Sequence, residues 1–118
     1  MATAPATTFE RDDWSPFRCD VAPERDAVRV VPCGELDIAT TPQLERQLRE
    51  LHEAGFRRIV LDLRGLRFMD STGLRLIMGQ DALARADGHA FTLVAGPPAV
   101  QRIFELACVL DRLDFRAG

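Results

Sequence analysis

The residues of this chain best suited to carry chemistry lie together in the segment Asp70-Ser71-Thr72-Gly73. The segment offers one carboxylate and two hydroxyls, and it directly precedes a predicted helix with Leu74, Ile77 and Met78 on one stripe. A hydroxyl at a helix N-terminus faces unpaired backbone N–H groups and the positive end of the helix dipole, so a phosphate added there would be stabilised. The segment therefore predicts a site for a phosphate or another anion, or else an ordinary N-cap.

A catalytic role for these residues has no support elsewhere in the sequence. The chain contains no G-x-S-x-G motif and no second aspartate motif, which disfavours a serine hydrolase and an aspartic protease. It also lacks the phosphate-cradling patterns G-x-x-x-x-G-K-[ST] and G-x-G-x-x-G, which disfavours a nucleotide enzyme. We therefore expect a protein that is not an enzyme and that carries no cofactor.

Metal binding is not indicated by the histidines or the cysteines. His52 and His89 lie far apart in the sequence, with no H-x-x-x-H pattern or nearby cysteine pair to complete a site. We expect both to be separate, solvated surface residues. Cys19, Cys33 and Cys108 are widely spaced and odd in number, and we expect them to be core thiols rather than metal ligands.

The composition is that of one ordinary globular domain, with 118 residues, 47% hydrophobic and 28% charged. The net charge is −3 and every basic residue is arginine, so no basic excess favours direct nucleic-acid binding. No stretch approaches the roughly 18 apolar residues of a membrane span, and the N-terminus lacks a signal-peptide pattern. These features predict a cytoplasmic protein without membrane insertion.

The first elements that must position the candidate site are a hairpin and a helix. Residues 1–15, rich in Ala, Thr and Pro and then charged, predict a flexible N-terminal lead-in, and residues 16–118 predict one domain. Strands are expected at Phe17–Val21 and Ala27–Val31. A helix follows, with Thr41 as its N-cap and Gly55 as its end.

Strand and helix alternate in the rest of the chain. Further strands are expected at Arg58–Leu63, Ala90–Val94 and Leu113–Phe115, and helices from Ser71 to about Gly88 and after Gly96-Pro97-Pro98. Leu66, Phe68 and Met69 are expected to form a buried approach to the candidate site. This order predicts an α/β fold, with a mixed, mostly parallel sheet of about four to five strands and crossover helices packed against it.

Three segments, read in order, resemble the STAS domain family, and specifically the bacterial anti-sigma factor antagonists. They are Cys33–Asp37 (CGELD), Leu66–Gly79 (LRFMDSTGLRLIMG) and Pro98–Phe104 (PAVQRIF). The resemblance covers about Phe17 to Phe115 and implies a single STAS-like domain. In that family, the serine directly after the aspartate of the central motif is phosphorylated, and this position matches Ser71.

The resemblance implies a partner-switching function. The unphosphorylated protein would bind an anti-sigma factor with serine kinase activity and release the sigma factor, and phosphorylation of Ser71 would block this binding. A PP2C-type phosphatase would restore the unphosphorylated form, and the ATP chemistry would belong to the kinase. The alternative is a STAS accessory subunit, or adaptor, of a membrane transport assembly.

The same resemblance implies which residues touch the partner, and it implies no metal. They are Asp37, Asp70, Ser71, Thr72, Gly73 and Arg75. Asp37 matches a position near the phosphorylation site, although a cap within its own turn explains it equally well. Gly34 is expected in a turn, and Gly73 where a side chain would crowd the partner. Arg75 stands where many relatives have a small residue, and it places a bulky cation beside the acceptor serine.

Overall fold

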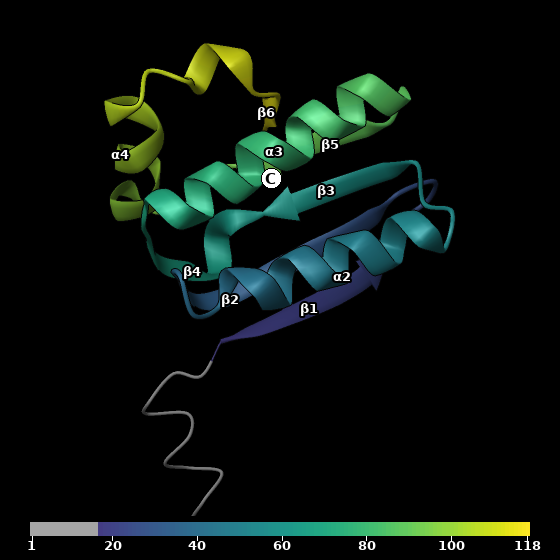
Figure 1. Ribbon diagram of the computed structural model, residues 1–118, viewed down its shortest axis with the longest axis horizontal. Coiled ribbons are helices and arrows are strands. Elements are labelled where there is room, and N and C mark those ends of the chain that lie inside the picture. The colour runs from purple at the N-terminus through teal and green to yellow at the C-terminus, as the bar shows by residue number, and fades with distance from the viewer. Residues whose placement is uncertain (1–16) are drawn as a thin grey trace, which may run out of the picture.

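Six strands and three α-helices make up the part of the chain that the computed structural model describes, residues 17–118 (Figure 1). The strands are β1 (Arg18–Pro23), β2 (Val28–Leu36), β3 (Arg58–Asp62), β4 (Leu66–Met69), β5 (Ala90–Val94) and β6 (Phe115–Arg116). The helices are α2 (Thr41–Glu53), α3 (Ser71–Asp87) and α4 (Pro98–Leu106), with short 3-10 turns at Leu63–Gly65 and Leu110–Arg112. The predicted lead-in, residues 1–15, lies outside the described residues.

The sheet is mixed and mostly parallel, which confirms the predicted α/β fold. Its order is β1-β2-β3-β5-β6, and β4 pairs separately with the second half of β2. Only β1 and β2 run antiparallel, because they form a hairpin, whereas the other pairs are parallel. Helices α2 and α3 lie side by side on one face of this sheet, and α4 lies beside β4 (Figure 1).

The core lies between the sheet and its helices. Alternate residues of β2, including Val28, Val30 and Leu36, are buried, as expected for a strand with one face against helices. Helix α2 contributes Leu44, Leu48 and Leu51 at spacings of four and three residues, so that its apolar stripe packs on the sheet. None of the helices in residues 17–118 has the length and hydrophobicity that crossing a bilayer requires.

Two predictions about the strands are wrong. Gly34 does not lie in a turn but inside β2, at a bulge where the pairing register with β4 shifts, and its φ of 112° requires glycine there. The segment Leu66–Met69 is the edge strand β4, in which Leu66 and Met69 are buried as predicted, and the prediction is wrong for Phe68 alone. Phe68 on this strand is 46% exposed.

The cysteines are not all core thiols, which corrects a further prediction. Cys19 on β1 and Cys33 on β2 are half-buried, and Cys108 is exposed just after α4, with a positive φ of 57°. Burial is the main cause that raises the pKa of the Cys19 thiol to about 11. All three are free thiols.

The sheet face opposite α2 and α3 carries a network of ion pairs around the buried carboxylate of Asp62. Asp62 accepts hydrogen bonds from Arg64 Nε at 3.0 Å and Nη2 at 2.8 Å, and from Arg29 Nη1 at 2.9 Å. Arg29 also contacts Glu24, at 2.6 Å. The bonds from Arg64, together with Arg29, lower the pKa of Asp62 to about 2, although burial acts in the opposite direction.

We expect Asp62→Asn to lower the free energy of unfolding at pH 7 by about 2 kcal/mol. The folded-state pKa of about 2 lies below the ordinary value of 3.8, so this contribution is complete above about pH 5 and is lost as the pH falls toward 2. Urea denaturation of the parent and of the Asp62→Asn variant, at pH 7 and at pH 3, measures this contribution to the free energy of unfolding. The control is Asp26→Asn, since Asp26 pairs with Arg58 at 3.5 Å with a side chain that is 77% exposed. An equal loss of stability for Asp62→Asn at both pH values would contradict this account.

Candidate functional site

The candidate site lies at one end of the sheet, where β2 and β4 finish together. Leu36 of β2 pairs with Met69 of β4, and the Asp70 N–H donates to the Leu36 carbonyl at 3.1 Å. Parallel strands bring their carboxyl ends to the same edge of a sheet. The turn that begins at Asp37 and the helix that begins at Ser71 therefore start from neighbouring points.

Asp70 fixes the start of α3 as its N-cap. Its Oδ1 accepts from the Thr72 N–H at 2.8 Å and from the Gly73 N–H at 3.1 Å, and its backbone is extended, as an N-cap requires. Ser71 is thereby the first helical residue and is exposed, whereas Thr72 is half-buried. Among the described residues the Ser71 hydroxyl has no hydrogen-bond partner, so it remains open to a second protein.

The cap changes one expectation about anion binding. Backbone N–H groups at a helix start were expected to stabilise a phosphate, but those of Thr72 and Gly73 already bond to Asp70. A phosphate on Ser71 would therefore lie beside a carboxylate and would need another source of positive charge. The helix dipole remains, but it is worth less than direct N–H donors.

Asp37 has a structural task within its own turn. Its Oδ1 accepts from the backbone N–H groups of Ala39 at 3.0 Å and Thr40 at 3.1 Å, which is an Asx-type turn leading into α2. Thr40, rather than the predicted Thr41, is the N-cap residue of that helix. The turn explains this aspartate fully, and it places the half-buried Asp37 at the same edge as Ser71.

Gly73 is buried, and the reason predicted for it is wrong. A Cβ at this position would lie 2.7 Å from Met69 Cγ and 2.9 Å from Leu36 Cδ2, both within the domain. Glycine is therefore required so that α3 can approach the ends of β2 and β4 closely. Gly73 therefore supports the site through packing inside the domain, and because it is buried it offers little surface to a partner.

The exposed surface around Ser71 combines a cation with apolar side chains that the sequence analysis missed. Arg75 is exposed one turn after Ser71, and together with Thr72 it lines a groove between α2 and α3. Ile38 is 77% exposed in the turn after β2, and Phe68 on β4 is 46% exposed. An apolar residue inside a polar turn was the signal available at Ile38. Contiguous exposed apolar surface is typical of protein–protein contact sites.

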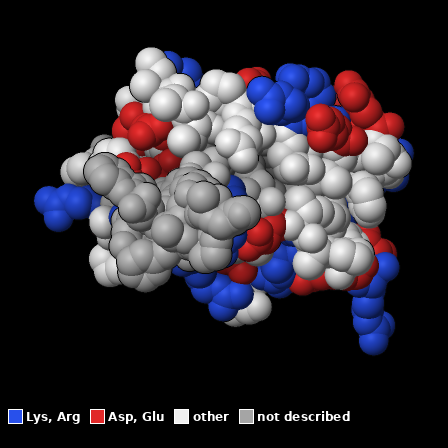
Figure 2. Space-filling model, turned by 90° about the horizontal axis from the view of Figure 1, so that it is seen from below, with Lys and Arg blue, Asp and Glu red and all other residues white. Residues whose placement is uncertain are grey.

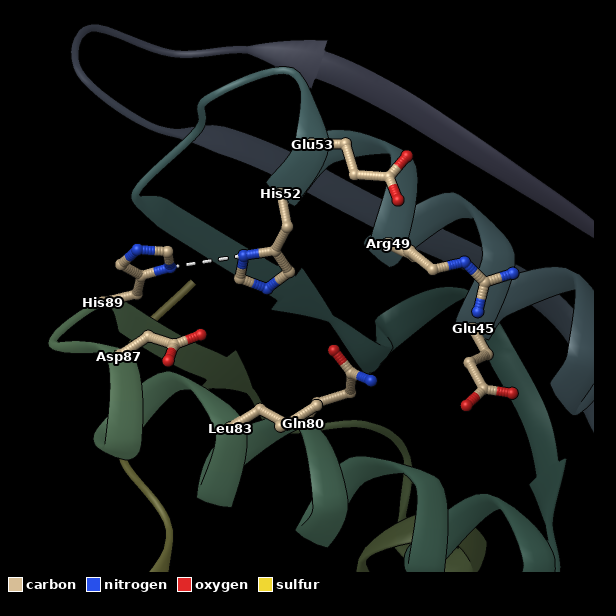
Figure 3. A pocket seen from close by; sticks show the side chains of 8 residues that line it. All are labelled: Glu45, Arg49, His52, Glu53, Gln80, Leu83, Asp87 and His89. Carbon is tan, nitrogen blue, oxygen red and sulfur yellow. Dashed lines mark hydrogen bonds between the residues drawn. The ribbon is translucent and has the colours of Figure 1, made fainter.

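A second cavity, of about 350 Å³, lies at the other end of the two helices (Figure 3). His52 and His89 meet there, with their Nδ1 atoms 3.3 Å apart, which corrects the prediction that they are separate surface residues. His89 follows the end of the 17-residue helix α3, about 25 Å along its axis from Ser71. The cavity extends back along α3, because Glu45, Gln80 and Leu83 line both this cavity and the groove that Thr72 and Arg75 line. Within residues 17–118, no three His, Cys, Asp or Glu side chains converge to hold a metal ion.

The charges on the surface are mixed in sign. Figure 2 views the molecule from the side on which β1 lies in Figure 1, and basic and acidic groups are interspersed over the coloured part of that face. The described residues also include ion pairs on the surface, such as Arg67 with Glu35 at 3.7 Å and Arg18 with Asp20 at 3.3 Å. No broad basic patch appears on the described residues of this face.

Comparison with known proteins agrees with this fold. The family model described as "Mlab, STAS domain" matches residues 19–113. An anti-sigma-B factor antagonist of Staphylococcus aureus (strain NCTC 8325 / PS 47) is 31% identical over 85 residues, which covers 72% of this chain and 79% of that protein.

Two solved structures have the same fold. The first, an anti-sigma factor antagonist from Mycobacterium paratuberculosis, superposes with a TM-score of 0.75 at 23% identity, covering 87% of each chain. The second, the anti-sigma factor antagonist SpoIIAA in its unphosphorylated form, gives a TM-score of 0.70 at 22% identity, covering 87% of this chain and 90% of that one.

The chain therefore belongs to the STAS domain family. Within that family, the relative and the two structures described above are all anti-sigma factor antagonists.

We expect Gly73→Ala to destabilise the domain by about 1 to 3 kcal/mol, because its methyl group would overlap Met69 and Leu36. Gly79→Ala on the same helix is the control, since nothing lies within 4 Å of a Cβ there. That variant should be more stable than the parent by about 0.5 to 1 kcal/mol, because glycine weakens a helix interior. Thermal unfolding of both variants measures the difference, and equal effects would show that α3 does not approach the strands this closely.

We expect Asp70→Ala to cost about 1 kcal/mol of stability through loss of the N-cap. Asp70→Asn keeps a side-chain oxygen that can accept the same hydrogen bonds, so this variant should lose much less stability. Chemical denaturation of the two variants compares them. A similar loss in both would mean that the charge of Asp70, rather than its hydrogen bonds, stabilises the helix start.

Proposed function

We propose that this chain is a phosphorylation-controlled anti-sigma factor antagonist whose switch residue is Ser71. The observation that carries the proposal is the exposed position of Ser71, at the first residue of α3 and directly after a carboxylate that fixes the helix start. In the unphosphorylated state the protein binds an anti-sigma factor with serine kinase activity, and the sigma factor is released. A PP2C-type phosphatase reverses the phosphorylation.

The switch needs no change of fold. Phosphorylation adds about −1.5 to −2 charges near pH 7. The new charge lies at the surface beside Asp70, whose own carboxylate is held by two backbone N–H bonds. Docking would then bring together like charges and remove a dianion from water, both of which oppose binding. The effect acts locally, on contact, while the core remains as it is.

The contact surface has the chemistry that this role requires. Ile38 and Phe68 supply exposed apolar area, and Asp37, Thr72 and Arg75 supply polar and charged groups around Ser71. Burial of apolar side chains provides affinity, whereas the central hydroxyl makes that affinity sensitive to phosphorylation. The protein acts in the cytoplasm as a binding partner, and catalysis belongs to the kinase and the phosphatase.

The names of similar proteins give the class of partner. The Staphylococcus aureus relative is named as an antagonist of the anti-sigma-B factor. One structure with the same fold is described as an unphosphorylated form. Both descriptions agree with a chain that exists in two states of phosphorylation and acts on an anti-sigma factor.

We expect Ser71→Ala to abolish phosphorylation by the cognate kinase and to leave binding to that kinase largely intact. Thr72→Ala is the matched control, because Thr72 is the adjacent hydroxyl but is half-buried, and it should still be phosphorylated. Phosphate incorporation with purified kinase and ATP measures both. Phosphorylation of the Ser71→Ala variant at the parental rate would contradict the assignment of Ser71.

A further inference from the structure

Arg75 is placed to reach a group on the side chain of Ser71. The two residues lie four positions apart on α3, and both are exposed. Residues at this spacing are neighbours on one face of a helix, and helical side chains tilt toward the N-terminus. The guanidinium of Arg75 can therefore reach the turn that begins with Ser71.

The same helix already contains an ion pair of this geometry. Asp81 and Arg85 are also four positions apart, and the Arg85 Nε lies 2.8 Å from the Asp81 Oδ2. An anion at one position and arginine one turn later thus meet without any distortion of α3. A phosphoserine side chain is longer than aspartate and carries more charge, so it should reach the arginine at least as well.

Arg75 has no carboxylate partner within the described residues, unlike Arg85 and Arg67, which pair with Asp81 and Glu35. Glu45 of α2 lines the groove between α2 and α3 together with Arg75, but the two side chains form no ion pair. Meanwhile the N–H groups of Thr72 and Gly73 are occupied by Asp70. A phosphate on Ser71 therefore finds these backbone donors taken and a free cation one turn away.

We propose that Arg75 binds the phosphate when Ser71 is phosphorylated, and that this pairing is part of the switch. The inference rests on the proposed function. In the unphosphorylated state Arg75 is free to meet an acidic side chain of the partner. Phosphorylation then does two things at once, because it adds an anion to the contact surface and withdraws a cation from it.

The pairing is tested on the full chain with phosphoserine installed at position 71 during translation. Titration of the phosphate by ³¹P NMR gives the midpoint of its second ionisation, which a neighbouring cation lowers and the carboxylates of Asp70 and Glu45 raise. We expect Arg75→Gln to raise this midpoint by about 0.5 pH unit. The change should shrink in 1 M salt, because exposed charges are screened.

Arg102→Gln is the control, since Arg102 is exposed on α4, and it should leave the midpoint unchanged. Identical midpoints for the parent and the Arg75→Gln variant would overturn the inference. Unfolding curves of the unphosphorylated proteins establish that both variants fold as the parent does.

The installed phosphoserine also separates this inference from the proposed function, because it needs no kinase. An effect of Arg75 without any phosphorylation of Ser71 by a cellular kinase would overturn only the proposed function. Phosphorylation of Ser71 by a kinase, with no effect of Arg75 on the phosphate, would overturn only the pairing.

Discussion

The structure depends on how Asp70 joins the end of a strand to the start of a helix. Its backbone N–H donates to the Leu36 carbonyl, and its side chain accepts from the N–H groups of Thr72 and Gly73 in the first turn of α3. These bonds fix the residue at which the helix begins, and hence which residues of α3 face inward. Gly73 and Ile77 are consequently buried, and Ser71 is left exposed.

This arrangement is consistent with the proposed switch, which needs no change of fold. The groups that build the site, Asp70 and Gly73, are committed to internal bonds and packing. The groups that a partner can touch, including Ser71, Arg75 and Ile38, are exposed. A change of charge on the second set leaves the first set undisturbed. Under the proposed function, phosphorylation of Ser71 therefore changes the free energy of partner binding rather than the stability of the fold.

Much of the fold follows from the sequence, because its longer elements have clear apolar periodicity and end signals. The leucines of α2 and the alternation in β2 and β3 are of this kind. Strand β4 has only four residues, two of them exposed, so periodicity does not reveal it. The bulge at Gly34 looks like a turn in sequence because glycine permits a positive φ in either setting.

The location of the site could be predicted from the sequence, but the hydrogen bonds and the packing that form it could not. The motif around Ser71 marked the helix start, yet the sequence does not reveal that Asp70 binds the N–H groups of Thr72 and Gly73 or that Gly73 packs inward. The contact between His52 and His89 depends on how α2 and α3 pack, which no local pattern reports. Such facts come from tertiary packing, where residues distant in sequence meet.

The most direct measurement for the central claim is intact-mass analysis of the protein isolated from its native cells, with fragmentation to locate any modification. The account predicts a fraction of molecules that carry one phosphoryl group on Ser71, and that this fraction changes with growth conditions. A protein without phosphate on Ser71 under every condition would contradict it, and would favour a constitutive binding module.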